Sequence, residues 1–134
     1  MNICGLFSGI NWWCYAAAAV LTFAFAALWY SVLFAKTRAR VFKEDIPEKM
    51  SVALALRTMG MQFAINALFG LWFFVLATHL GFWFALITLC VFCGWQKGML
   101  NFQFPKFKDY MTAAMIDAGY TFIVGMVFIL FAFV

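Results

Sequence analysis

The chain has 134 residues, of which 68% are hydrophobic and only 10% are charged, and its formal net charge at pH 7 is +4. A soluble domain is about half apolar and about a quarter charged, so this composition excludes an ordinary soluble protein and indicates a polytopic membrane protein. The length excludes several domains, and residues 1–134 are expected to form a single transmembrane domain.

Four apolar stretches are long enough to cross a bilayer core of about 30 Å, which takes roughly 20 helical residues. They cover about 10–35, 51–78, 82–100 and 110–134. The first is interpreted as a retained span, because the preceding "MNICGLFSG" has neither a basic n-region nor a small-residue cleavage site. The short turn between the second and third spans predicts a tight hairpin, with His79 as a solvated turn residue. The expected fold class is all-α, with four transmembrane helices in an antiparallel bundle.

The basic residues predict the orientation of these spans. All nine lie in or near the linkers 36–50 and 96–109: Lys36, Arg38, Arg40, Lys43, Lys49, Arg57, Lys97, Lys106 and Lys108. The positive-inside rule therefore puts both linkers in the cytoplasm and both termini outside. The positive charge is a topology signal first, and contact with anionic membrane lipid is a secondary consequence. Nucleic acid is not an expected partner.

Asp117 is the only carboxylate of the fourth span, within "MIDAGY" (115–120). An ionised carboxylate in a membrane costs several kcal/mol unless it is paired, protonated or hydrated. Arg57 lies at the same estimated depth in the second span, about 10 Å from the cytoplasmic side. Both residues lie on stripes of small residues, which let membrane helices approach closely. We therefore expect the second and fourth helices to touch there and Arg57 to pair with Asp117.

The intramembrane pair of Arg57 and Asp117 has three interpretations. The preferred one is a dry, structural ion pair that fixes the register of two helices. The others are a proton relay or ion-coupling site, and side chains that extend to the cytoplasmic face.

Gln62 and Asn66 form a second polar face on the second span, nearly opposite Arg57. One small bundle cannot easily bury both faces in the same seam, so either another helix of the chain or a second protomer covers Gln62 and Asn66. Interhelical hydrogen bonding is the expected role of these amides, and coordination of a ligand or ion is the alternative.

The cysteines and the histidine predict no metal site, no cofactor and no enzyme. "CVFC" (90–93) has the spacing of a redox or metal pair but lacks a second pair or a nearby histidine, so Cys90 and Cys93 are interpreted as apolar filler. Cys4 and Cys14 both lie towards the outer face, where a disulfide is one option. No nucleophile–histidine–acid set can be assembled from His79 and one distant aspartate.

Three stretches resemble a known family: "NWWCYAAAAVLTFAFAALWYSVLFAK" (11–36), "NFQFPKFKDYM" (101–111) and "MIDAGYTFIVGMVFILF" (115–131). They resemble the opening, the last loop and the last helix of the bacterial domain-of-unknown-function 1761 family. The resemblance rests on Asn11, Trp12, Trp29, Tyr30, Ser31, Gly119 and Tyr120. It implies a small four-span protein of the bacterial inner membrane, and it implies no activity.

These observations predict a small integral membrane protein with a non-catalytic structural or accessory role. It would act as a homo-oligomer or as a subunit of a membrane assembly, because the second span has more polar and small faces than one bundle needs. The first alternative is an oligomeric channel or transporter for a small ion or solute that uses Arg57, Asp117 and Asn66. A redox subunit that holds a quinone or haem is the second.

Overall fold

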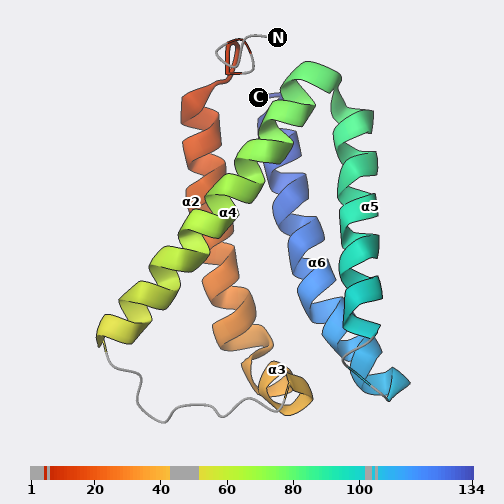
Figure 1. Cartoon of the computed structure of the whole chain (residues 1–134). Helices are drawn as coiled ribbons and strands as arrows, with labels where there is room; N and C mark the ends of the chain where they lie inside the picture. Colours follow the sequence, from red (N-terminus) through yellow and green to blue (C-terminus); the bar gives the residue numbers. More distant parts are fainter. Residues whose placement is uncertain (1–4, 6, 43–51, 102–103, 105) are drawn as a thin grey trace.

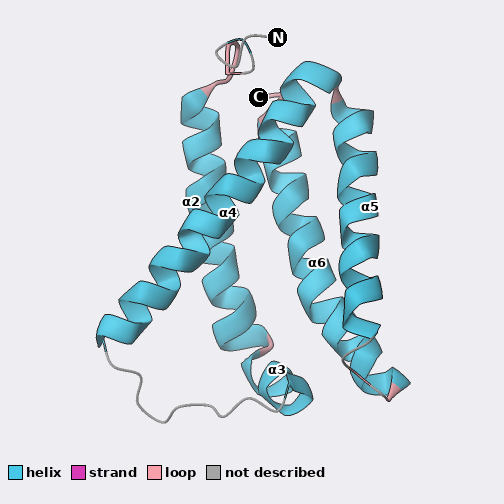
Figure 2. Cartoon of the chain, in the orientation of Figure 1, coloured by secondary structure: helices cyan, strands magenta, loops and turns pink. Residues whose placement is uncertain are grey.

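The chain folds into helices throughout its described part. The computed structural model describes residues 5, 7–42, 52–101, 104 and 106–134, and these contain no strand (Figure 2). The helices are α2 (Trp12–Leu28), the π-helical segment η1 (Trp29–Leu33), α3 (Ala35–Phe42), α4 (Val52–Leu80), α5 (Phe82–Asn101) and α6 (Phe107–Phe131). The expected all-α class is therefore confirmed for the described residues.

Three helices have the length and apolar character needed to cross a membrane. They are Trp12–Leu33, which joins α2 to η1, then Val52–Leu80 and Phe107–Phe131. The remaining one, α5, is apolar over the shorter stretch Phe82–Gly98. Each of the four predicted spans thus corresponds to a helix, with ends that differ by a few residues from those expected.

A single residue, Gly81, separates α4 from α5. Its φ of +86° lies in the left-handed region, which glycine adopts without the steric cost that a Cβ would add. The predicted hairpin is therefore tighter than expected, because α4 continues through His79, which is exposed, to Leu80.

Two ends of the molecule differ in how closely the helices pack. The start of α2, the end of α6 and the turn at Gly81 lie together at one end, which we call the terminal end (Figure 1). From that turn α4 and α5 diverge towards the opposite end, where α3 lies; we call this the α3 end. The helix α6 contacts α2, α3, α4 and α5, so it is the central element.

The terminal end is closely packed because small residues let α6 approach its neighbours. A Cβ at Gly70 of α4 would overlap the ring of Phe128, and one at Gly125 of α6 would overlap the side chain of Leu89. Phe128 and Leu89 are both fully buried. Close approach at small residues is a common way for membrane helices to pack.

At the α3 end, the stretch 36–50 identified as a linker begins with a helix that the sequence did not predict. Phe34 ends η1 in a non-helical conformation, and α3 then packs against η1 and α6. Val41 of α3 is buried. The result is that the basic residues of α3 lie beside the end of the first span and not in an extended loop.

Candidate functional site

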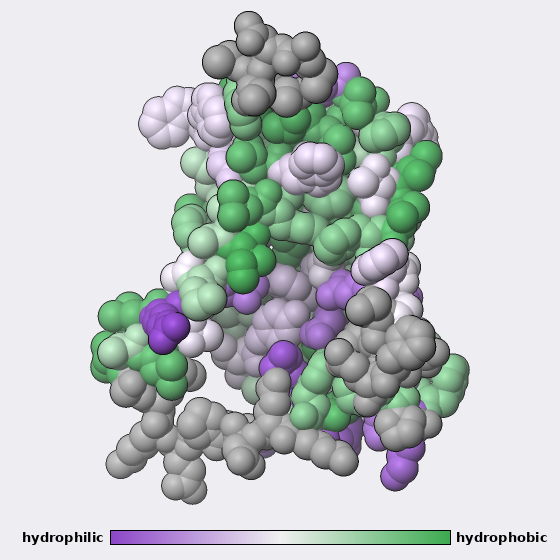
Figure 3. Space-filling model, viewed as in Figure 1, coloured by the Kyte–Doolittle hydropathy of each residue, from purple (hydrophilic) through white to green (hydrophobic). Residues whose placement is uncertain are grey.

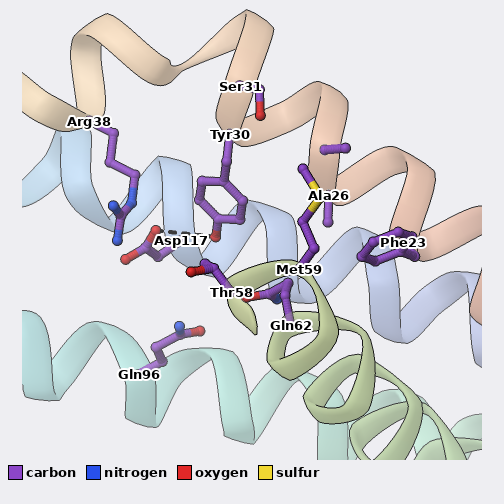
Figure 4. Close-up of a pocket in the computed structure, with 11 residues that line it drawn as sticks. Phe23, Ala26, Tyr30, Ser31, Arg38, Thr58, Met59, Gln62, Gln96 and Asp117 are labelled. Carbon is purple, nitrogen blue, oxygen red and sulfur yellow. Dashed lines mark hydrogen bonds between the residues drawn. The ribbon is translucent and has the colours of Figure 1, made fainter. Parts of the chain in front are cut away.

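An open cavity of about 460 Å³, lined by both polar and apolar side chains, lies between the helices at the α3 end. Every helical element of the described chain contributes to its lining: Phe23, Ala26 and Ala27 from α2, Tyr30 and Ser31 from η1, Arg38 from α3, Thr58, Met59 and Gln62 from α4, Gln96 from α5 and Asp117 from α6 (Figure 4). Figure 3 shows the same region from outside, where polar side chains gather in a hollow between α4 and α5. The terminal half of that face is mostly apolar.

Charged and aromatic groups from three elements meet on one side of the cavity. The Tyr30 hydroxyl donates a hydrogen bond to Asp117 Oδ1 at 3.3 Å. The guanidinium carbon of Arg38 lies 5.5 Å from the centre of the Tyr30 ring, and the guanidinium points towards the carboxylate of Asp117 (Figure 4). The cavity therefore presents one cation and one anion close together.

The backbone explains why Tyr30 and Arg38 reach this side together. The π-helical turns of η1 shift the side chains away from the positions that a continuous α-helix would give them, and such segments occur frequently at functional sites. After Phe34, α3 runs back against η1, which brings Arg38 over the Tyr30 ring. The Arg38 guanidinium also stacks on Phe42 of its own helix, at 4.9 Å.

A hydrogen-bonded chain of side chains connects the cavity to the packed interior. Gln62 Nε2 donates to Asn66 Oδ1 at 3.1 Å, and Asn66 Nδ2 donates to the Tyr120 hydroxyl. The Tyr120 ring lies 4.9 Å from the Tyr30 ring. Another helix of the same chain, α6, therefore covers Asn66, whereas Gln62 is half-buried and lines the cavity.

Gln96 extends into the cavity region from α5 (Figure 4). Its side-chain oxygen is shielded from solvent and accepts no hydrogen bond within the described part of the chain. A buried amide oxygen without a donor is costly, so such an atom points to a missing partner.

The predicted pairing of Arg57 with Asp117 is not what the structure shows. Arg57 is exposed and does not line the cavity, and the structure records no ion pair between these two described residues. Of the small residues on the same stripe of the helix, Ala53, Gly60 and Ala64 are exposed and only Ala67 is half-buried. The physical reason is that only one face of α4 can contact α6, and the face of Asn66 does so through Tyr120.

The residues that carry the family resemblance mostly have structural roles. Asn11 caps α2, since its side chain accepts a hydrogen bond from the Cys14 backbone N–H at 3.3 Å. Trp29 Nε1 donates to the Ile116 carbonyl at 3.0 Å. Gly119 lies beside the Trp29 ring, where even an added Cβ would make only ordinary contact.

The remaining resemblance residues divide between the surface and the site. Trp12 is half exposed and makes edge contact with Tyr15, whereas Ser31 lines the cavity. The two end motifs of the chain, "ALWYS" and "MIDAGY", are therefore in direct contact through Tyr30, Asp117 and Tyr120.

The described cysteines are free thiols: Cys14 is half-buried, Cys90 exposed and Cys93 buried. Cys4, the other half of the disulfide considered from the sequence, lies outside the described residues. Within the described part of the chain, no three histidine, cysteine, aspartate or glutamate side chains are grouped in a way that could hold a metal ion.

Sequence reasoning missed Arg38 and Gln96 as site residues. In the sequence, Arg38 is one of the basic residues that predict the orientation, and Gln96 belongs to the linker 96–109. One signal was available for each. Gln96 is an uncharged polar residue directly after an apolar run, and Arg38 follows the aromatic pair Trp29–Tyr30 by about two helical turns.

No protein-family model matches this chain, and neither the curated proteins nor the solved structures give a significant match.

Proposed function

We propose that the chain is a multi-pass protein of a bacterial inner membrane, in which α2, α4, α5 and α6 cross the bilayer and both termini lie outside. Helix length supports this proposal for three of the four helices. The described basic residues lie on α3 or near the α3 end of the other helices: Lys36, Arg38, Arg40, Arg57, Lys97, Lys106 and Lys108. By the positive-inside rule, the α3 end then faces the cytoplasm. The bacterial inner membrane follows from the resemblance in sequence.

The function we propose is the non-catalytic binding of a small polar or amphipathic molecule in the α3-end cavity. The observation that carries it is a cavity of about 460 Å³ that brings Arg38 of the basic helix α3 together with Asp117 of the apolar helix α6. Ligand pockets have volumes of roughly 300–1,000 Å³. Ionisable residues within membrane helices are costly to keep and usually serve a function.

Binding is favoured over conduction through one protomer because the cavity ends against a packed interior. Phe73, Phe74 and Phe128 are fully buried on the terminal side. Tyr15 from α2 packs against two of these rings and donates a hydrogen bond to the Ala67 carbonyl at 2.7 Å. A solute that crossed the membrane through this interior would have to displace these aromatic side chains.

Filling the cavity tests this function. Ala27 lines the cavity, so Ala27→Phe should exclude the ligand, whereas Ala24→Phe makes the same change on an exposed position of α2 outside the lining. Native mass spectrometry of the protein released from mild detergent should show small molecules retained by the wild type and by Ala24→Phe but not by Ala27→Phe. Equal retention by all three proteins would contradict the proposal.

An accessory or homo-oligomeric role is the second candidate, and one observation favours it. Over 52–61 of α4, every side chain that the structure describes is exposed, including Arg57. In Figure 1 this part of α4 leans away from the other helices. A cation on an apolar helix is costly in lipid unless it is paired or reaches the interface, so contact with another protein subunit here would stabilise Arg57.

A further inference from the structure

We propose that the cavity binds the headgroup of a zwitterionic amphiphile, which consists of a phosphate and an ammonium group that carries N–H donors. The ligand enters sideways from the bilayer between α4 and α5. This inference rests on the proposed binding function and names the chemical class of the ligand.

The charged residues of the lining indicate that the ligand carries both a negative and a positive group. Arg38 and Asp117 are the charged residues of the lining, and the others are hydroxyl, amide or apolar side chains. A guanidinium binds phosphate oxygens well, and a carboxylate binds an ammonium group. A ligand with both charges can contact both residues favourably at once, whereas a purely anionic headgroup would be repelled by the carboxylate of Asp117 and a purely cationic one by the guanidinium of Arg38.

The hydrogen-bonding groups distinguish between two kinds of zwitterion. Gln96 Oε1 lacks a donor within the described chain. The terminal torsion of glutamine is roughly two-fold, so a rotation would exchange the places of this oxygen and the amide nitrogen beside the cavity. A primary ammonium group supplies N–H donors to Gln96 and Asp117, whereas a trimethylammonium group has none. The aromatic ring that would best attract a quaternary ammonium group, that of Tyr30, is already covered by the Arg38 guanidinium.

The position of the cavity indicates that the ligand has an apolar chain. Its polar hollow opens on the side of the molecule between α4 and α5, where apolar side chains border it (Figure 3). Within the lining, Phe23, Ala26 and Met59 form an apolar wall on the side of α2 and α4. A headgroup among the polar residues would leave its acyl chain along this wall and in the surrounding lipid.

The test uses the full chain in maltoside micelles, with thermal unfolding followed by tryptophan fluorescence. Three lysophospholipids are titrated at equal mole fractions: ethanolamine, choline and glycerol headgroups on the same acyl chain. Because a ligand that binds only the native state raises the melting temperature, each titration yields an apparent Kd. We expect lysophosphatidylethanolamine to bind most tightly, and sn-glycero-3-phosphoethanolamine, which has the same phosphodiester headgroup without a chain, to give no shift.

Single substitutions in the lining test which side chains contact the headgroup. Arg38→Gln and Asp117→Asn should each weaken binding of the ethanolamine lipid by about tenfold, the factor expected for loss of a charge-assisted hydrogen bond. Gln96→Leu, a milder change, should reduce the preference for ethanolamine over choline. Arg57→Gln is the matched control, because it removes an arginine at the same end but outside the cavity, and it should leave the Kd unchanged.

Several outcomes would overturn the inference. Equal stabilisation by the three headgroups, a preference for choline or glycerol, or an equal effect of Arg57→Gln and Arg38→Gln would each do so. A shift with sn-glycero-3-phosphoethanolamine that matches the shift with the lysolipid would show a water-soluble ligand instead of an amphiphile. If Ala27→Phe abolishes retention of small molecules while the headgroups do not differ, only this inference fails; if Ala27→Phe changes nothing, the binding function itself fails.

Discussion

The hydroxyl of Tyr30 donates a hydrogen bond to Asp117 Oδ1 at 3.3 Å, joining residues that are 87 positions apart in the chain. Tyr30 lies in η1, near the end of the first apolar helix, and Asp117 lies in α6, so the bond connects the beginning of the fold to its central helix. Asp117 is therefore hydrogen-bonded to η1 on one side of an open cavity. Asp117 thus has a polar partner in η1, Tyr30, and not in the second span, where the sequence predicts Arg57 as its partner.

Removal of the Tyr30 hydroxyl should destabilise the protein modestly. Tyr30→Phe keeps the ring contact with Tyr120 and deletes the hydrogen bond to Asp117, so the free energy of unfolding should fall by about 1 kcal/mol. Denaturant titration in detergent measures the change. Tyr110→Phe, at the start of α6, is the control and should have little effect; an equal loss in both variants would show that the hydrogen bond does not contribute.

The buried amide of Asn66 should contribute more. Its side chain is only 4% exposed and bonds both Tyr120 and Gln62. Asn66→Leu leaves both partners without their bond and should cost about 1–2 kcal/mol, the range for interhelical hydrogen bonds in membranes. In a Gln62→Leu/Tyr120→Phe background the same substitution should cost clearly less, because its partners are absent. Identical costs in the two backgrounds would contradict the network.

Two glycines of α4 should respond oppositely to the same substitution. Gly70→Ala places a Cβ into the Phe128 ring, and overpacking of this kind costs about 1–3 kcal/mol. Gly60→Ala meets nothing within 4 Å and should be neutral or slightly stabilising, because alanine is the better helix former. Melting temperatures of the two variants, measured side by side, test this. Phe128→Leu should partly rescue Gly70→Ala.

The proposed orientation predicts which reporters are active on the chain. Alkaline phosphatase fused after Val134 should be active and green fluorescent protein at the same position dark, because the proposal places the C-terminus outside. The same reporters fused after Phe42 should behave in the opposite way, since the α3 end is proposed to face the cytoplasm. Fluorescence from the C-terminal fusion would refute the orientation.

The exposed part of α4 predicts a contact with a second copy or another subunit. A cysteine at Leu56, in a variant whose native cysteines are replaced by serine, should form cross-linked species in native membranes under mild oxidation. A cysteine at Val20, an exposed position of α2, is the control and should cross-link less. A monomer as the sole product for both variants, together with a monomeric mass in gentle detergent, would exclude this role.

The positions of the helices could be predicted from the sequence because helix formation in an apolar run is a local property. A stretch of roughly 20 apolar residues satisfies its backbone hydrogen bonds within itself, whatever it packs against. Gly81 likewise marks the hairpin turn locally. The short helix α3 was missed because its polar, basic sequence resembles a linker, and it is held in place by contacts with η1 and α6.

The rotation of each helix about its axis was decided only by the tertiary structure. A helix that is apolar on nearly all sides carries no amphipathic pattern that indicates its inward face. On α4, the sequence allows either of two faces to point towards the other helices, the face of Arg57 or the face of Asn66. In the structure the face of Asn66 points inward, because Gly70 fits closely against Phe128 and Asn66 donates a hydrogen bond to Tyr120. That rotation left Arg57 outside and formed the cavity in which Arg38, from an element the sequence did not predict, lies beside Asp117.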